Sequence, residues 1–340
     1  MAEFVAVGDA HFTDSSGSGG LSKYVQNPDK MVADEIRRGP VKYARDNGIS
    51  NILLLADQND GPRASYSGQR ELADVVRENP DLRWHAILGN HEMYSEVPEN
   101  GHALELFDLF GLQNLTIYTH PTDVKIDRAP VRFLPYPHLD FSDRALNIFH
   151  NEVYGSKSDS GRTVKKEGMN RSKAVAVGGH LHTGHKVRNT YFPGTLYQNN
   201  FGEQLPKYFA HIQFNSVADH EIEFINHDPV YKLHTVVLSS RADLENIPRG
   251  KKNLVKLVIQ DGADVNASDY SAFSNIVLIK NFRSKEDLRA VLTEDLSNAE
   301  ELVVRVDDFF DVWVESLDVE QSMREKIVDV RRRVLNKIVK

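Results

Sequence analysis

The stretch EFVAVGDAH (residues 3–11) is an unbroken apolar run that ends in an aspartate and a histidine. Two later stretches, NILLLAD (residues 51–57) and RWHAILGN (residues 83–90), repeat this pattern. Such runs are typical of strands that are buried on both faces, as in a layered α/β sheet. Helix-like segments separate them, at DKMVADEI with VKYARDNG (residues 29–48) and at SGQRELADVVREN (residues 67–79). We therefore predict an α/β fold.

Further strand-like runs follow, with few helices between them. They are VRFLPY (131–136), ALNIFH (145–150), KAVAVGG (173–179), YFAHIQF (208–214) and HEIEFINH (220–227). We predict that residues 1–228 form a sandwich of two packed sheets flanked by helices.

A new series of strand-like and helix-like runs begins near Asp228 and Pro229, and it predicts a second, smaller unit. Three strand-like runs and two short helix-like runs, RADLENI and ASDYSAF, predict a small α/β module over residues 229–283; the strands are HTVVLSS (234–240), NLVKLVIQD (253–261) and SNIVLIKNF (274–282). Residues 284–340 are predicted to be a helical tail, and the Ser/Gly-rich TDSSGSGG (residues 13–20) a flexible loop.

Composition limits the classes of protein to which the chain can belong. Hydrophobic residues make up 40% and charged residues 26%, which is typical of a soluble globular protein, and we expect no membrane span and no signal peptide. Cysteine is absent, which excludes disulfides and thiolate zinc sites and fits a bacterial or phage-infected host cytoplasm. The net charge of −8 argues against coating of nucleic acid by bulk charge, but bound cations could still attract phosphate locally.

Polar residues that can bind metals cluster at the ends of the predicted strands, where α/β sheets build their sites. They are Asp9, His11, Asp57, Asp60, Asn90, His91, His150, His180 and His182. Carboxylate, imidazole and carboxamide ligands suit Mn²⁺, Fe²⁺ or Zn²⁺, and a pair of ions can clamp a phosphoryl group. Single motifs have ordinary alternatives, namely a turn at Asp9, a helix N-cap at Asn90 and a packed core histidine at His150.

The series GDxH, xDxxD, GNHE, an isolated His and GHLH resembles that of the calcineurin-like metallophosphoesterases. YFPGTLYQNNFGE (residues 191–203) narrows the resemblance to the SbcD-type nucleases of double-strand-break repair, and particularly to their phage recombination-nuclease branch. The small module resembles the DNA-capping domain of that family, and the tail resembles its ATPase-binding region. The motifs lie within residues 1–228, whereas the C-terminal resemblance rests on layout alone.

The resemblance implies a metallophosphoesterase sandwich with two divalent ions, Mn²⁺ or alternatively Mg²⁺. The implied ligands are Asp9, His11 and His182 for one ion and Asn90, His150 and His180 for the other, with Asp57 bridging them. His91 would orient the phosphate or protonate the leaving 3′-oxygen.

Three positions near these motifs are less regular. Asp60 would either orient a ligand or His91, or cap the following loop. Ala56 stands where the family usually has glycine, and we expect little effect from so small a side chain. His185 has no implied role and is predicted to begin the next strand.

The function implied is that of a Mn²⁺-dependent exonuclease or endonuclease acting on double-stranded DNA ends, in recombination and repair. Its partners would be a second copy of the chain and an SbcC-type coiled-coil ATPase. ALELFDLFG (residues 103–111) would be a dimer helix or a core-facing amphipathic helix, and the apolar stripe of the last helix (Ile327, Val330, Val334 and Ile338) would bind a partner or pack on its own domain. The alternatives are a phosphatase or small-molecule phosphodiesterase, and a non-catalytic DNA-end tether.

Overall fold

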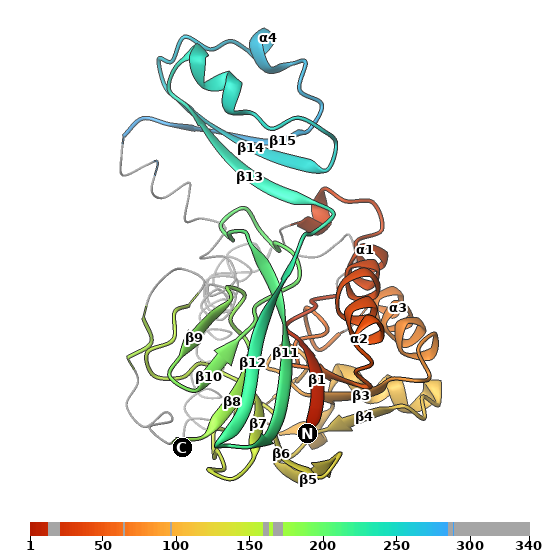
Figure 1. The fold of residues 1–340 in the computed structure, drawn as a ribbon. Helices are drawn as coiled ribbons and strands as arrows, with labels where there is room; N and C mark the ends of the chain where they lie inside the picture. The colour runs from red at the N-terminus through yellow and green to blue at the C-terminus, as the bar shows by residue number, and fades with distance from the viewer. Residues whose placement is uncertain are drawn as a thin grey trace, which may run out of the picture.

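The computed structural model describes residues 1–12, 21–63, 65–95, 97–158, 163–165, 173–284 and 288 of the chain. The loop predicted at residues 13–20 and nearly all of the predicted tail lie outside these residues. The described part confirms an α/β fold with two six-stranded mixed sheets and a separate three-stranded sheet (Figure 1).

The first sheet has the strand order β12-β11-β1-β2-β3-β4. Its parallel part contains the three apolar runs predicted as buried strands: β1 (Ala2–Val7), β2 (Asn51–Leu54) and β3 (Arg83–Ile87), followed by β4 (Leu115–Tyr118). The hairpin of β11 (Lys207–Ser216) and β12 (Asp219–His227) adds two strands beside β1, because β11 pairs antiparallel with β1.

The second sheet has the strand order β5-β6-β7-β8-β10-β9. Its strands are β5 (Thr122–Ile126), β6 (Ala129–Leu134), β7 (Leu146–His150), β8 (Val175–Gly179), β9 (His185–Val187) and β10 (Thr190–Phe192). The central strands β6, β7 and β8 are parallel and were predicted. Strands β4, β5 and β10 were not predicted from the sequence, and only the start of β9, at His185, was.

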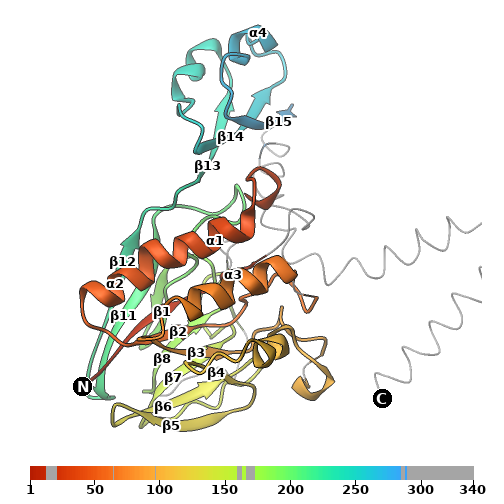
Figure 2. The same ribbon diagram turned by 90° about the vertical axis from the view of Figure 1, so that its right-hand side faces the viewer.

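Helices cover one side of the first sheet (Figure 2). They are α1 (Pro28–Ile36), the π-helical turn η2 (Arg37–Val41), α2 (Lys42–Asp46) and α3 (Tyr66–Arg77). One core lies between these helices and the first sheet, and a second core lies between the two sheets. Leu139, Phe141 and Val153 of loops cover the other side of the second sheet, so in the described residues the prediction of flanking helices holds for the first sheet only.

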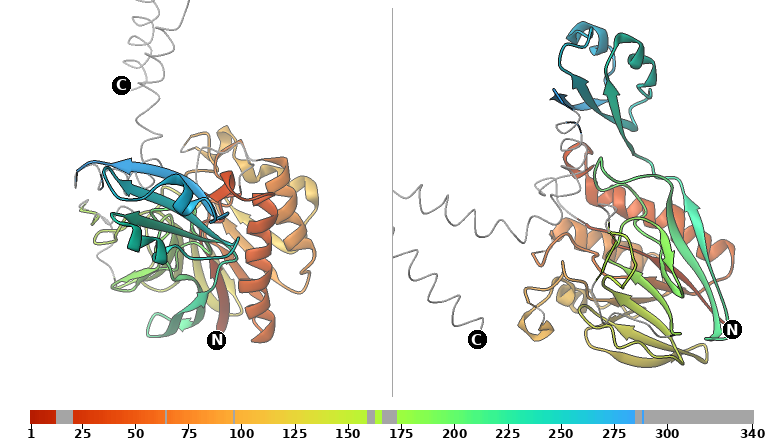
Figure 3. Two further views of the ribbon diagram at one scale, coloured as in Figure 1. Left: turned by 90° about the horizontal axis from the view of Figure 1, so that it is seen from above. Right: turned by 90° about the vertical axis from the view of Figure 1, so that its left-hand side faces the viewer.

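The third sheet begins directly after the boundary predicted at residue 228. β13 (Lys232–Leu238), β14 (Asn253–Gln260) and β15 (Ile276–Phe282) are parallel, and η5 (Arg241–Asn246) and α4 (Ala267–Tyr270) connect them. The sheet has its own apolar core and stands apart from the larger sheets (Figure 3). In the part of the chain that is described, no helix has the length and apolarity needed to cross a bilayer.

Three short 3₁₀ helices complete the described fold: η1 (Leu21–Lys23), η3 (Pro98–Asn100) and η4 (Ala103–Phe110). η4 replaces the amphipathic helix predicted at residues 103–111. With three residues per turn, Leu104 and Phe107 lie on one line against the core, while Leu106 and Leu109 lie on another line that faces outward.

Candidate metal centre

The carboxyl ends of parallel strands from both large sheets meet at one edge of the sandwich. Because β1, β2 and β3 are parallel, the residues that follow them come together, and β7 and β8 do the same in the second sheet. The predicted ligands thereby converge from strand ends that lie far apart in the sequence: Asp9, His11, Asp57, Asn90, His150, His180 and His182.

Four of these residues form a compact group. The amide oxygen Oδ1 of Asn90 lies 3.1 Å from His150 Nε2 and 3.1 Å from His180 Nδ1. Asp57 Oδ2 lies 2.9 Å from His150 Nε2. Neighbouring ligands of an octahedral ion bound at about 2.1 Å lie about 3 Å apart, so these separations fit the first coordination shell of a divalent cation.

A second pair of histidines lies beside this group. The Nε2 atoms of His11 and His182 point at each other across 3.1 Å. Ligand atoms of His11, Asp60 and His91 also lie within 4.8 Å of one another, and of these three only His11 is an implied ligand. The assignment of these residues to one ion or the other stays a prediction.

Asp9 has a buried carboxylate oxygen that a bound cation would satisfy. Its side chain is buried, and Oδ1 accepts the backbone N–H of His180 at 3.1 Å, but Oδ2 has no hydrogen-bond partner among the described residues. A buried carboxylate oxygen without a partner is costly, and a cation would satisfy it. The residues present therefore fit a bound metal.

Two glycines at strand ends let the carboxylates approach. A Cβ on Gly89 would lie 2.0 Å from Asp57 Oδ1, and one on Gly179 would lie 2.6 Å from Asp9 Oδ1. Ala56 adopts a φ of 73°, in the left-handed region, so alanine there carries strain of about 1 kcal/mol. Glycine would avoid that strain, and the expectation of little effect from alanine at this position stays a prediction.

Glu92, the last residue of GNHE, has a structural role that was not predicted from the sequence. Its buried carboxylate accepts backbone N–H groups from Asp57 at 3.0 Å, Asn59 at 3.2 Å and Gly89 at 2.7 Å, and also from Gln58. Burial, and next the charge of Asp57, raises the pKa of Glu92 to about 7. This side chain fixes the two loops that present Asp57 and Asn90.

Glu203 is a second residue to which the sequence assigned no role. Its Oε1 lies 3.1 Å from His182 Nδ1, which directs His182 Nε2 toward His11. Burial alone would raise the pKa of Glu203, but Lys207, with Nζ 2.5 Å away, and His182 lower it to about 2. A carboxylate that orients a ligating imidazole is a common feature of metal sites, and the motif FGE that ends at Glu203 was the available signal.

His91 stands at the rim of the cluster. Its Nδ1–H donates to the backbone oxygen of Asp60 at 3.2 Å, which leaves Nε2 facing Asp57 Oδ2 at 4.0 Å. Burial lowers the pKa of His91, but the carboxylates of Asp57 and Asp60 outweigh it, so the pKa is raised overall. The imidazole is therefore suited to carry a proton at neutral pH.

Asp60 lies between two of the histidines. Its carboxylate Oδ1 is 3.5 Å from His11 Nδ1 and 3.9 Å from His91 Nδ1. The carboxylate therefore lies beside both rings, and its role, orienting a ligand or His91 or capping the following loop, stays a prediction.

The structure decides one of the ordinary alternatives and confirms the predicted strand start at His185. No helix begins at Asn90, since residues 90–92 form a turn, so the N-cap interpretation is wrong. His185 begins β9 as predicted; its ring stacks on Phe192, and its Nδ1–H donates to the backbone oxygen of Thr183 at 2.8 Å.

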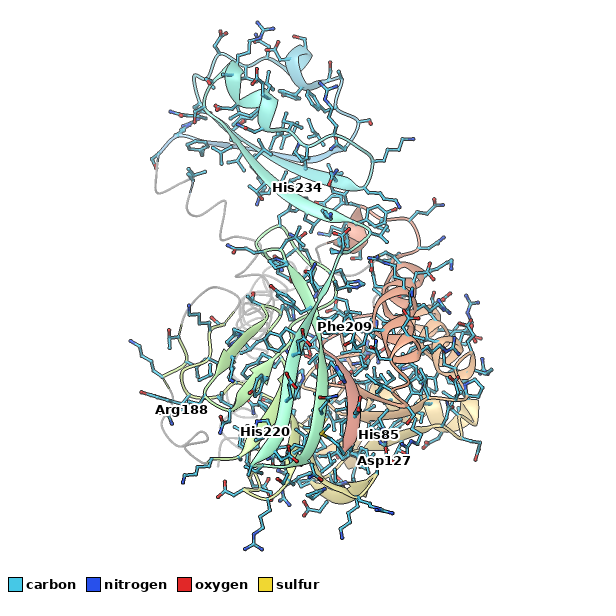
Figure 4. All side chains as sticks on the ribbon, in the orientation of Figure 1. His85, Asp127, Arg188, Phe209, His220 and His234 are labelled. Carbon is cyan, nitrogen blue, oxygen red and sulfur yellow. The ribbon has the colours of Figure 1, made fainter. Side chains whose placement is uncertain are left out.

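His85 is a buried histidine that belongs to the core. It lies within β3, well away from His234 on the third sheet (Figure 4). Burial lowers the pKa of His85 to about 4, so its ring is neutral, and Nδ1 pairs with Tyr118 Oη at 3.2 Å.

Metal binding to this centre is predicted to depend on pH through His150. Burial lowers its pKa, but Asp57 and Asp9 outweigh burial and raise the pKa to about 9 in the metal-free protein. An ion must displace that proton, so the affinity for Mn²⁺ should rise by up to tenfold per pH unit from pH 7 to 9. Calorimetry in buffers of different ionisation enthalpy measures the released proton. A pH-independent affinity with no proton release would contradict this assignment.

Comparison of the chain with protein-family models and with curated proteins finds no match, so the interpretation of this centre rests on its residues and their geometry.

Proposed function

We propose that this chain is a Mn²⁺-dependent nuclease that hydrolyses phosphodiester bonds at the ends of double-stranded DNA. The observation that carries the proposal is the convergence of carboxylate, carboxamide and imidazole groups at one edge of the sandwich, with the separations of about 3 Å that a divalent cation requires. Two bound ions would supply positive charge against the phosphate and activate the attacking water.

The protein's own residues then have separate tasks. Asp9, His11 and His182 would hold one ion, called the first ion below. Asn90, His150 and His180 would hold the second ion, and Asp57 would bridge the two. His91 Nε2 faces the cluster from the rim and would donate a proton to the 3′-oxygen as the P–O3′ bond breaks. Asp60 and Glu203 would hold the rings of His11 and His182 in the orientation that this arrangement requires.

The surroundings of the site favour DNA over a small substrate. A phosphatase or small-molecule phosphodiesterase would not need the third sheet, which begins at β13. Every implied ligand position is occupied by a competent ligand, which favours a nuclease over a non-catalytic tether.

Substrate class can be tested by comparing linear duplex DNA with a chromogenic phosphodiester, each in Mn²⁺. The proposal predicts that duplex DNA is cleaved much faster. Faster hydrolysis of the chromogenic ester, with intact DNA, would instead support the small-molecule phosphodiesterase.

We also propose that the protein works as a homodimer, with an SbcC-type ATPase as its partner, in the cytoplasm. The residues proposed to bind the ATPase lie outside the described part of the chain. The dimer proposal is supported by η4, where Leu109 is 80% exposed and Leu106 is 44% exposed. Two exposed leucines on one line suit a second copy of the same surface.

Replacing Leu109 tests the dimer. Leu109→Glu places charge on this line, so the variant is expected to be a folded monomer, whereas the wild type is a dimer by light scattering. Leu205→Glu is a matched control, because Leu205 is 38% exposed and lies far along the chain from η4. A Leu109→Glu protein that stays dimeric would show that η4 is not the interface.

A further inference from the structure

Residues 195–203, here called the strap, join β10 to β11 and contact both the metal centre and the third sheet. On the side of the metal centre, Tyr197 Oη donates to the backbone oxygen of Ala10 at 2.8 Å, between the ligands Asp9 and His11. At its end, Glu203 holds His182 Nδ1 at 3.1 Å. The strap therefore contacts both loops that would bind the first ion.

On its other side the strap is bonded to the first strand of the third sheet through two side chains: Thr235 Oγ1–H donates to the backbone oxygen of Phe201 at 3.4 Å, and Gln198 bonds Leu233. Gln198 is buried, and its Oε1 accepts the backbone N–H of Leu233 at 3.0 Å while its Nε2 donates to the Leu233 oxygen at 3.1 Å. The same Nε2 donates to the backbone oxygen of Glu203 at 2.7 Å. One carboxamide thus bonds β13 and the residue that orients His182.

The connection to the third sheet has a second anchor, which does not lead to the metal centre. The buried carboxylate of Glu35, on α1, accepts the backbone N–H of Val230 at 2.7 Å and pairs with His227 Nε2 at 2.7 Å. Arg38 pairs with Glu35 as well. Glu35 therefore fixes the linker between β12 and β13, and Gln198 fixes the start of β13 to the strap.

We propose that Gln198 is a positioning residue that couples the placement of the third sheet to the metal ligand His182, through Glu203. A displacement of β13 moves the Gln198 carboxamide, and with it the Glu203 backbone and the carboxylate that orients His182. Occupation of the third sheet by a ligand would then change the affinity of the first ion, and by reciprocity the first ion would stabilise the attachment of β13. This inference rests on the proposed metal centre.

The test measures Mn²⁺ affinity by calorimetry in the full chain, with Gln198→Leu against wild type. Loss of a carboxylate partner of a ligating histidine lowers metal affinity by about 10-fold to 100-fold. Replacing a residue one bond further away should therefore lower the Mn²⁺ affinity by about tenfold or less. We expect this loss for one of the two ions and an unchanged affinity for the other. If Gln198 had a purely structural role, Gln198→Leu would lower the affinity for both ions or for neither.

Asn114→Leu is the control for loss of a half-buried amide that bonds several backbone groups. Asn114 Nδ2 donates to the backbone oxygens of Val76, Asn79 and Leu82, far along the chain from the strap. Its Mn²⁺ affinities should equal those of wild type. If Gln198→Leu does not fold, Gln198→Met, an uncharged side chain of similar length, removes the same bonds and should lower the affinity for the same ion.

A double-mutant cycle with Glu35→Gln tests the direction of the coupling. Loosening the linker should weaken the first ion in the wild-type background and have no further effect in the Gln198→Leu background. Equal effects in both backgrounds, or two unchanged Mn²⁺ affinities in Gln198→Leu, would overturn the inference while leaving the metal centre intact. A wild-type protein that binds no Mn²⁺ would overturn both.

Discussion

A His91→Ala variant is expected to bind both metal ions with wild-type affinity and to cleave duplex DNA about 10² to 10⁴ times more slowly. The ring reaches the centre from the rim, with Nε2 4.0 Å from Asp57 Oδ2, and is no member of the compact group of Asp57, Asn90, His150 and His180. Its removal takes away the proton donor for the 3′-oxygen. The measurement pairs a Mn²⁺ titration with the cleavage rate of end-labelled DNA.

His185→Ala is the matched control for this variant. His185 follows the ligand His182 by three residues, but its ring bonds Thr183 and Lys157 of the neighbouring loops and stacks on Phe192. The His185→Ala variant should bind metal and cleave DNA as the wild type does. Normal cleavage by His91→Ala would show that the assigned role of His91 is wrong.

The largest effect on stability is expected from Glu92→Ala. Four buried backbone N–H groups, those of Asp57, Gln58, Asn59 and Gly89, would lose their acceptor together. Each such loss costs about 1 to 3 kcal/mol, so the free energy of unfolding should fall by about 4 kcal/mol or more. Urea denaturation of the metal-free protein measures this change, and Mn²⁺ binding should weaken with it because the same loops carry Asp57 and Asn90.

Glu78→Ala provides the comparison for Glu92→Ala. Glu78 is an exposed glutamate at the end of α3 that pairs with Arg37 at 2.8 Å, and exposed ion pairs contribute about 1 kcal/mol or less. If Glu92→Ala unfolds at the same urea concentration as Glu78→Ala, the four amides find other acceptors and Glu92 does not organise these loops.

Periodicity and strand ends predicted much of the fold and the location of the cluster. The runs that form β1, β2 and β3 are mainly apolar because one face of each strand packs against the helices and the other against the second sheet. Burial on both faces produces a continuous apolar run that can be recognised in the sequence. Short strands such as β10, with three residues, carry too little pattern to be predicted.

The residues that support the ligands were harder to predict than the ligands themselves. Asp57 and Asn90 stand in motifs with fixed spacing, whereas the contacts of Glu92 and Glu203 arise only when distant segments fold together. Glu203 is 21 positions from His182, and Gln198 is 35 positions from Leu233. No local spacing rule reaches across such distances, so these contacts required the structure.

DNA hydrolysis by the metal centre at this edge of the sandwich can be followed as degradation of end-labelled linear duplex DNA by the full chain. The assay is run without metal and with Mn²⁺, alone and with an SbcC-type ATPase, for the wild type and for Asp57→Asn. The wild type should cleave the DNA in Mn²⁺ only, and Asp57→Asn should not cleave it. Intact DNA under every condition with the wild type, or equal cleavage by Asp57→Asn, would contradict DNA hydrolysis by this centre.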